Sequence, residues 1–200
     1  MTYQEDRDRL KALLCEFSVR HGDFVLASGQ RSNIYIDAKL TTCRAAAMPL
    51  IGRVFLRKIR ERGWMPVAVG GLTMGADPIV TAIARESLEG DQIVNSFLIR
   101  KEPKKHGRQR FLEGLEETRG LPVVIVDDVC TKGESTAKAI EYSRSSGLEV
   151  LGAICLVDRE AGARELLSQH GCELLSVFCL RELIKESEEY DSGRCQGIAC

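Results

Sequence analysis

The apolar residues of this chain fall into two kinds of pattern that alternate along its length. Short runs rich in Val, Ile and Leu are typical of strands buried on both faces, whereas apolar residues spaced three or four positions apart predict amphipathic helices. From residue 67 onward the two patterns take turns, and the strand-like runs cover residues 67–72, 93–100, 123–126, 150–157 and 174–178. This alternation predicts an α/β fold with a mostly parallel central sheet and helices on both of its faces.

Helical and hairpin patterns precede that region. Residues 5–21 are spaced as an amphipathic helix that ends at Gly22, and residues 44–62 predict a second helix. Between them, residues 24–37 indicate two short strands around a glycine-centred turn. This hairpin would form either a small flap before the main sheet or a plain sheet edge.

The size and composition of the chain suit a single domain. It has 200 residues, 44% of them hydrophobic, which is enough to bury an ordinary core. We expect an N-terminal helix and flap over residues 1–40, an α/β core over 44–185, and a tail over 186–200. The net charge of −1 gives no electrostatic case for binding nucleic acid or a membrane, and no apolar run approaches the ~20 residues of a membrane span. Eight cysteines without C-x-x-C spacing and a polar N-terminus unlike a signal peptide favour a cytoplasmic protein with reduced thiols.

One strand-like run changes character abruptly at its end. The β-branched residues 123–126 are followed by Asp127 and Asp128, then by a glycine and several hydroxyl residues, and then by a helical pattern that stops at Gly147. A strand, a tight loop and a helix start in this order form the place where α/β sheets bind anions, because the first N–H groups of a helix lack partners inside it.

The residue types of this loop narrow the ligand. Backbone amides and hydroxyls of residues 131–136 can wrap a phosphate, whereas the preceding carboxylates would repel it unless they hold an attached group, such as ribose hydroxyls or Mg²⁺. A sugar with a 5′-phosphate satisfies both requirements. The plainer alternative is a buried strand that ends in a polar turn, with Asp128 or Ser135 only capping a helix. A Walker A loop is excluded, because Gly133 is followed by Glu134 and not by lysine.

Two further stretches favour an anionic ligand. Residues 70–75 form a glycine-rich turn, with Asp77 expected as the N-cap and Pro78 as the first residue of the next helix. Residues 100–110 follow another strand-like run, and six of these eleven residues are Lys or Arg. Such a run is usually a solvated surface, but beside two anion-binding loops it could close as a cationic lid over a departing pyrophosphate. RNA is the other candidate partner, although the run has no interleaved aromatic residues to stack on bases.

The stretch over residues 123–136 resembles the 5-phosphoribosyl-1-pyrophosphate (PRPP) signature of type I phosphoribosyltransferases, which have a Rossmann-like α/β fold. Over roughly residues 5–185 the chain is similar to orotate phosphoribosyltransferases. Residues 70–75 match the pyrophosphate loop of that family, the run Arg100-Lys101-x-x-Lys104-x-His106-Gly107 matches its catalytic loop, and residues 24–32 match its small N-terminal hood over the base.

The resemblance implies that orotate and Mg·PRPP react to give orotidine 5′-monophosphate and pyrophosphate, a step of pyrimidine (UMP) biosynthesis. It implies Mg²⁺ as the cofactor, held mainly through PRPP and water without a direct protein ligand. It also implies a homodimer whose lid residues reach the neighbouring site. The residues that it implies as catalytic are Lys104, His106 and Asp128, with His106 as a proton donor.

The same resemblance assigns the binding residues. Those implied to contact PRPP are Gly71, Thr73, Arg100, Lys101, Lys104, His106, Asp127, Asp128, Thr131, Lys132, Gly133, Glu134, Ser135 and Thr136. Those implied to contact orotate are Ala27, Thr131 and Arg159.

Two residues depart from the pattern of many family members. Ala27 in the hood and Met74 in the pyrophosphate loop stand where those members have lysine. This difference leaves more of the pyrophosphate charge to Mg²⁺ and to Arg100, Lys101 and Lys104.

Two other functions stay open at this point. One is a phosphoribosyltransferase that takes a purine or uracil, against which Arg159 favours an acidic base. The other is a regulator that binds PRPP on the same fold and controls transcription or RNA, for which we expect no appended helix-turn-helix region.

Overall fold

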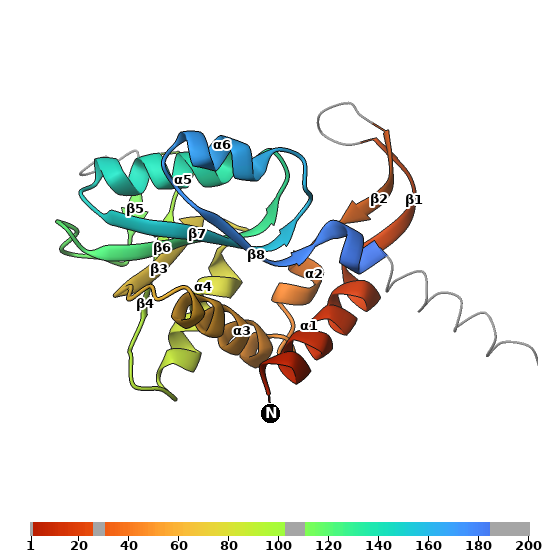
Figure 1. Ribbon diagram of the computed structural model, residues 1–200, viewed down its shortest axis with the longest axis horizontal. Helices are drawn as coiled ribbons and strands as arrows, with labels where there is room; N and C mark the ends of the chain where they lie inside the picture. The colour runs from red at the N-terminus through yellow and green to blue at the C-terminus, as the bar shows by residue number, and fades with distance from the viewer. Residues whose placement is uncertain (1, 26–30, 103–110, 185–200) are drawn as a thin grey trace, which may run out of the picture.

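A six-stranded sheet forms the centre of the structure (Figure 1). The structure is a computed structural model, and it describes residues 2–25, 31–102 and 111–184. The strands have the bounds β1 (Val19–Val25), β2 (Arg31–Ile36), β3 (Ala68–Leu72), β4 (Asn95–Ile99), β5 (Leu112–Glu113), β6 (Pro122–Cys130), β7 (Glu149–Asp158) and β8 (Leu174–Cys179). In the main sheet they lie in the order β5-β4-β3-β6-β7-β8, and every neighbouring pair is parallel except β4 and β5. The predicted α/β fold with a mostly parallel sheet is therefore confirmed.

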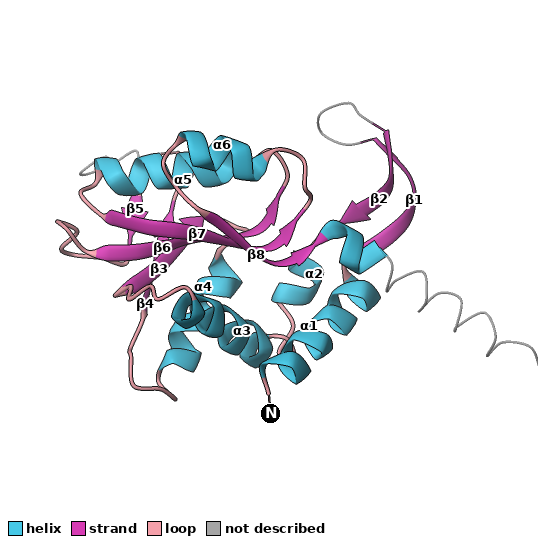
Figure 2. Cartoon of the chain, viewed as in Figure 1, coloured by secondary structure: helices cyan, strands magenta, loops and turns pink. Residues whose placement is uncertain are grey.

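Helices cover both faces of this sheet, as Figure 2 shows. Their bounds are α1 (Tyr3–Phe17), α2 (Lys39–Thr42), α3 (Met48–Glu61), α4 (Asp77–Ser87), α5 (Glu134–Ser145) and α6 (Ala163–Gln169). Successive side chains of a strand point to opposite faces, so a strand between two helical layers must be apolar throughout. On β6, Val124 and Val126 join the buried cluster under α3 and α4, whereas Val123 and Ile125 join the cluster under α5 and α6.

The N-terminal segment forms a helix and a separate two-stranded hairpin. The helix predicted over residues 5–21 ends at Phe17, because Val19 already pairs with Ile36 in the antiparallel sheet of β1 and β2. In Figure 1 this hairpin stands beside the main sheet, and β2 leads directly into α2. The predicted hairpin is confirmed, and its turn, residues 26–30, lies outside the described residues.

Other boundaries differ from the prediction for local reasons. The helix expected from residue 44 begins at Met48, where Pro49 occupies the first turn and its missing N–H costs nothing. Asp77 is the first residue of α4 and not its N-cap, a position that Ala76 holds. The short α2 and the two-residue β5 were not predicted, because neither is long enough to display a periodic pattern.

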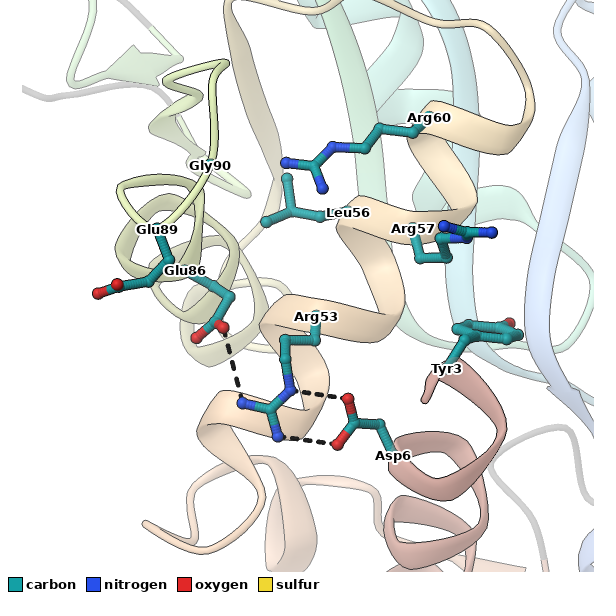
Figure 3. Close-up of a pocket in the computed structure, with 9 residues that line it drawn as sticks. All are labelled: Tyr3, Asp6, Arg53, Leu56, Arg57, Arg60, Glu86, Glu89 and Gly90. Carbon is teal, nitrogen blue, oxygen red and sulfur yellow. Dashed lines mark hydrogen bonds and ion pairs between the residues drawn. The ribbon is translucent and has the colours of Figure 1, made fainter. Parts of the chain in front are cut away.

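An ion-pair network fastens α1 to the helical layer of α3 and α4 (Figure 3). Arg53 on α3 donates two hydrogen bonds to the buried Asp6 carboxylate, at 2.7 and 2.9 Å, and lies 3.6 Å from Glu86 on α4. Fork-shaped pairing of this kind is strong and directional. A surface pocket of about 290 Å³ opens beside the network, and none of the residues that line it belongs to the loop between β6 and α5. We therefore assign this pocket to the attachment of α1.

Candidate active site

The loops after β3 and β6 meet at one edge of the sheet. These two strands are parallel neighbours, with Val69 opposite Val124, so their carboxyl ends lie side by side. A Cβ atom built on Gly75 would lie only 2.5 Å from Asp128 Oδ1, and one built on Gly71 would collide with the carbonyl oxygen of Val126. The absence of a side chain at Gly75 therefore lets the β3–α4 loop approach Asp128, and its absence at Gly71 lets β3 pack closely on β6. The two loops adjoin, as the sequence predicted.

The two acidic residues occupy the last part of β6 and point in different directions. Asp127 accepts hydrogen bonds from the Asp128 amide at 3.0 Å and from the Thr136 hydroxyl at 2.7 Å. Asp128 accepts from the Val129 amide at 2.9 Å, and its other oxygen lies 3.8 Å from Lys39 Nζ. Neither carboxylate caps α5 in the described hydrogen bonds, so the capping alternative is wrong for Asp128.

Burial and like charge act together on the first acid. Although Asp127 keeps a small exposed surface, desolvation of its carboxyl and the adjacent Asp128 raise the pKa of Asp127 to about 7. The hydrogen bonds from Thr136 and from the Asp128 amide oppose this rise. An acid with such a pKa is typical of a functional site, because its protonation changes near neutral pH.

The loop that follows has the geometry of an anion-binding turn. Gly133 adopts the left-handed conformation, with φ +82°, as the N-cap of α5, and among the described residues no side chain caps this start. Glu134 and Ser135 are exposed in the first turn, so Ser135 does not cap the helix either. Thr131 is half-buried and Lys132 exposed at the mouth of the loop. The helix start therefore presents backbone N–H groups to solvent, as a phosphate site requires.

Thr136 differs from the other hydroxyl residues of this loop. Its side chain is buried, and its hydroxyl is turned inward onto Asp127 at 2.7 Å and toward Cys130 Sγ at 3.2 Å. Its backbone remains at the helix start, but its hydroxyl is already engaged within the protein.

The end of β7 brings Arg159 beside this loop. Its amide donates to the carbonyl oxygen of Cys130 at 2.8 Å, because β6 and β7 pair up to that point. The preceding Asp158 is buried and accepts from Arg164 Nε and from the Glu160 amide, both at 2.8 Å. Asp158 thus shapes the turn, and Arg159 is the cation left next to the anion-binding loop.

The foot of the basic run lies beside the glycine loop. The Thr73 amide donates a hydrogen bond, at 2.9 Å, to the carbonyl oxygen of Ile99 at the end of β4. The segments that follow β3 and β4 therefore begin side by side. Arg100 and Lys101 are exposed there, and Arg100 Nε lies 2.8 Å from Glu113 Oε1. The predicted site residues Ala27, Lys104 and His106 lie outside the described residues.

One residue near the acid pair was missed by the sequence reasoning. Lys39 at the start of α2 lies 2.8 Å from Asp37 and 3.8 Å from Asp128, and its hydrogen bond to Asp37, with added attraction from Asp128, raises the pKa of Lys39. The apolar alternation of β2 stops at Ile36. The polar residues Asp37 and Lys39 that follow are a local sign that the strand ends there in a turn. Only the fold shows that this turn carries the lysine to the acids.

Comparisons with known proteins agree with this geometry. The family model described as phosphoribosyl transferase domain matches residues 45–172. The orotate phosphoribosyltransferase of Aquifex aeolicus is 41% identical over 182 residues, covering 90% of this chain and 98% of that protein, and that of Synechocystis is 40% identical over 177 residues, covering 88% of each. In the part of the chain that the structure describes, no helix is long and apolar enough to cross a membrane.

Solved structures give the same result. A crystal structure of Mycobacterium tuberculosis H37Rv orotate phosphoribosyltransferase aligns with a TM-score of 0.79 and 37% identity over 89% of this chain and 98% of that one. The same enzyme in complex with PRPP aligns with a TM-score of 0.75 and 33% identity, covering 89% of this chain and 98% of that one. An adenine phosphoribosyltransferase from Leishmania donovani, at 19% identity and a TM-score of 0.63, shares the fold.

Proposed function

Because the chain belongs to the orotate phosphoribosyltransferases, we propose that its β6–α5 loop and acid pair hold the ribose 5-phosphate of PRPP while orotate binds beside Arg159. The enzyme transfers the phosphoribosyl group from PRPP to orotate in pyrimidine biosynthesis. The observation that carries our assignment of the site is the close approach of the β3–α4 loop to the acid pair, where a Cβ atom on Gly75 would lie only 2.5 Å from Asp128 Oδ1.

The acid pair and the β6–α5 loop bind different parts of PRPP. At the anomeric carbon the bond to pyrophosphate breaks and the bond to a ring nitrogen of orotate forms, while positive charge builds on the ribose. Asp127 and Asp128 accept hydrogen bonds from the ribose hydroxyls and lie near the developing cation. The backbone of residues 133–136, with Thr131, Lys132 and the exposed Ser135, holds the 5′-phosphate, so the ring is oriented for in-line attack.

The glycine loop and the basic run act on the leaving group. The amides around Gly71 and Thr73 approach one end of the pyrophosphate, and Arg100 and Lys101 lie at the foot of the segment beside that loop. We propose that Arg100 exchanges its partner Glu113 for pyrophosphate oxygens when substrate is present. Lys104 and His106 complete the lid, with His106 as the proton donor.

Phosphoribosyltransferases generally use Mg²⁺ with PRPP, and the described residues fit an ion held through substrate. Among them, no group of three His, Cys, Asp or Glu side chains could form a protein cage for a metal. Mg²⁺ keeps several waters and binds substrate phosphates readily, so PRPP oxygens and water would supply its ligands. Its charge would offset that of the pyrophosphate.

The remaining assignments follow the same proposal. Ala27, Thr131 and Arg159 contact orotate, with the guanidinium of Arg159 on its carboxylate. The enzyme forms a homodimer in which lid residues reach the neighbouring site. The whole chain acts as one domain, and its described cysteines are free thiols, as suits a cytoplasmic enzyme.

The test is a substrate panel with a matched pair of arginine variants. Purified protein is mixed with Mg·PRPP and orotate, uracil or adenine, and base consumption is followed by absorbance. We expect turnover of orotate, and a rise of about tenfold or more in its KM for Arg159→Ala, because a charge-assisted hydrogen bond is lost. Arg181→Ala, which removes an exposed arginine paired with Glu160, serves as the control and keeps the wild-type KM. Turnover of adenine or uracil in place of orotate, or no consumption of PRPP, would refute the proposal.

A further inference from the structure

A line of buried side chains runs from the acid pair into the sheet. The Thr136 hydroxyl lies 2.7 Å from Asp127 Oδ2 and 3.2 Å from Cys130 Sγ. The buried Cys155 thiol lies on the neighbouring strand β7, opposite Asp127 in the sheet. The contacts of Thr136 join α5 to β6 directly behind a carboxylate that faces the ribose in the proposed function.

The donors and acceptors along this line of side chains can be assigned from their chemistry. An ionised carboxylate only accepts, so the Thr136 hydroxyl donates its proton to Asp127 and is left to accept from the Cys130 thiol. Interaction with Cys130 and burial raise the pKa of Cys155 well above its ordinary value, so this neighbouring thiol adds no negative charge behind Asp127. The three side chains behind Asp127 are each at most 2% exposed, so water does not compete for these protons.

We propose that Thr136, supported by Cys130, is a positioning residue that aims the Asp127 carboxylate at the ribose and stabilises its ionised form. The identity of the ligand rests on the proposed function, whereas the coupling between Thr136 and Asp127 is a property of the free protein. The hydroxyl of Thr136 therefore acts through Asp127, and the phosphate is left to the backbone and to the exposed side chains of the same turn.

The surroundings of Asp127 make this support necessary. The titratable groups nearest to it are Asp128 and Cys130 on β6, Cys155 and Asp158 on β7, Lys39 at the start of α2 and Asp77 at the start of α4. On α5, which packs on β6, the charged side chains Glu134, Lys138, Glu141 and Arg144 are exposed to solvent. Lys39 lies against Asp128, and Asp158 is neutralised by Arg164. Desolvation and Asp128 both disfavour the ionised form of Asp127. The hydrogen bond from Thr136 is the side-chain contact that favours that form.

The experiment measures kcat/KM for PRPP between pH 5 and 9 in a set of variants. Thr136→Val removes the donor and keeps the shape, and Thr136→Ser restores the donor. Cys130→Ala and Cys130→Ser form a second pair further along the line. Ser143→Ala is the control for a buried hydroxyl on the same helix, since Ser143 lacks a hydrogen-bond partner among the described residues. Cys172→Ala is the control for a buried thiol elsewhere.

We expect Thr136→Val to move the acidic limb of the profile upward by about one pH unit, a loss of about tenfold below that limb that becomes smaller toward pH 9. Thr136→Ser returns the limb to its original position. Cys130→Ala shifts it in the same direction by less, Cys130→Ser reverses that shift, and both controls leave it in place. A uniform loss at every pH, or an unmoved limb in Thr136→Val, would overturn the inference.

A second readout separates this inference from the proposed function. The Asp127 carboxyl is followed by ¹³C NMR titration of the ligand-free wild type and of Thr136→Val. A higher titration midpoint in the variant supports the coupling even if the wild type does not turn over orotate. An unchanged midpoint overturns the coupling even if the wild type is fully active.

Discussion

Replacement of Asp127 by asparagine tests the electrostatics of the acid pair without any substrate. The pKa of Asp127 is raised to about 7 in the folded protein, mainly by desolvation and then by Asp128, whereas an unfolded chain ionises this group near its ordinary value of 3.8. Between these two pH values the folded state holds a proton that the unfolded state has released. Stability contributed by this group is therefore present at low pH and is lost as pH rises from about 4 to about 7.

The size of the effect follows from the difference between the two pKa values. One pH unit corresponds to about 1.4 kcal/mol, so the full difference sets an upper limit of about 4 kcal/mol. Asp127→Asn carries no titrating proton and its side-chain oxygen can still accept from Thr136. The stability of the variant relative to wild type should therefore increase by about 3 kcal/mol between pH 5 and pH 8, since part of the full difference falls below pH 5.

Urea unfolding of the ligand-free proteins at several pH values measures this change. The exposed Asp91 provides a matched control, because Asp91→Asn makes the same substitution at a carboxylate that stays in solvent. For a protein of this size, even half of the predicted change moves the melting temperature by several degrees, so thermal scans give a second measurement. An Asp127→Asn protein whose stability follows the wild-type pH curve in parallel would refute the reasoning.

Four further changes test other parts of the structure. Lys104→Ala should lower kcat by about tenfold or more in the orotate assay without a change in melting temperature, and wild-type turnover would reject its place in the lid. Asp128→Asn should lower kcat/KM for PRPP far more than stability; equal losses would indicate a structural role. Gly75→Ala places a methyl group 2.5 Å from Asp128 Oδ1 and should raise the KM for PRPP about tenfold, with an unchanged KM refuting the loop contact. Arg53→Met leaves Asp6 buried without its partner and should cost about 2 kcal/mol of stability in urea while the KM values stay constant; a loss of activity without a loss of stability would contradict that role.

The parts of this fold that are visible in the sequence are those fixed by neighbours along the chain. The β6 strand, its acid pair and the glycine turn after it could be predicted, because a doubly buried strand must be apolar and a left-handed helix start favours glycine at position 133. The end of α1 could not, because the pairing of Val19 with Ile36 depends on a strand seventeen residues away.

Within the site, the same division holds. The approach of Lys39 to Asp128 brings the start of α2 to the end of β6, two segments far apart in the sequence, and no periodic pattern predicts it. The sequence does not distinguish the buried hydroxyl of Thr136 from the exposed hydroxyl of Ser135, because both are hydroxyl residues in the same turn. A difference of one position on a helix turns a side chain by about 100°, and the register of α5 on β6 decides which of the two is buried.

The left-handed glycine at the start of α5 has a mechanical consequence for the two substrates. A Cβ atom on Gly133 would lie 3.1 Å from Cα of Ala163, so the phosphate turn rests directly on the first residue of α6. The segment before α6 carries Arg159, whose amide is tied to Cys130 at 2.8 Å. In the proposed function these two segments support the phosphoribosyl donor and the acceptor base, so the two supports are in direct contact. We expect that binding of one substrate orders both segments and lowers the entropic cost of binding the second.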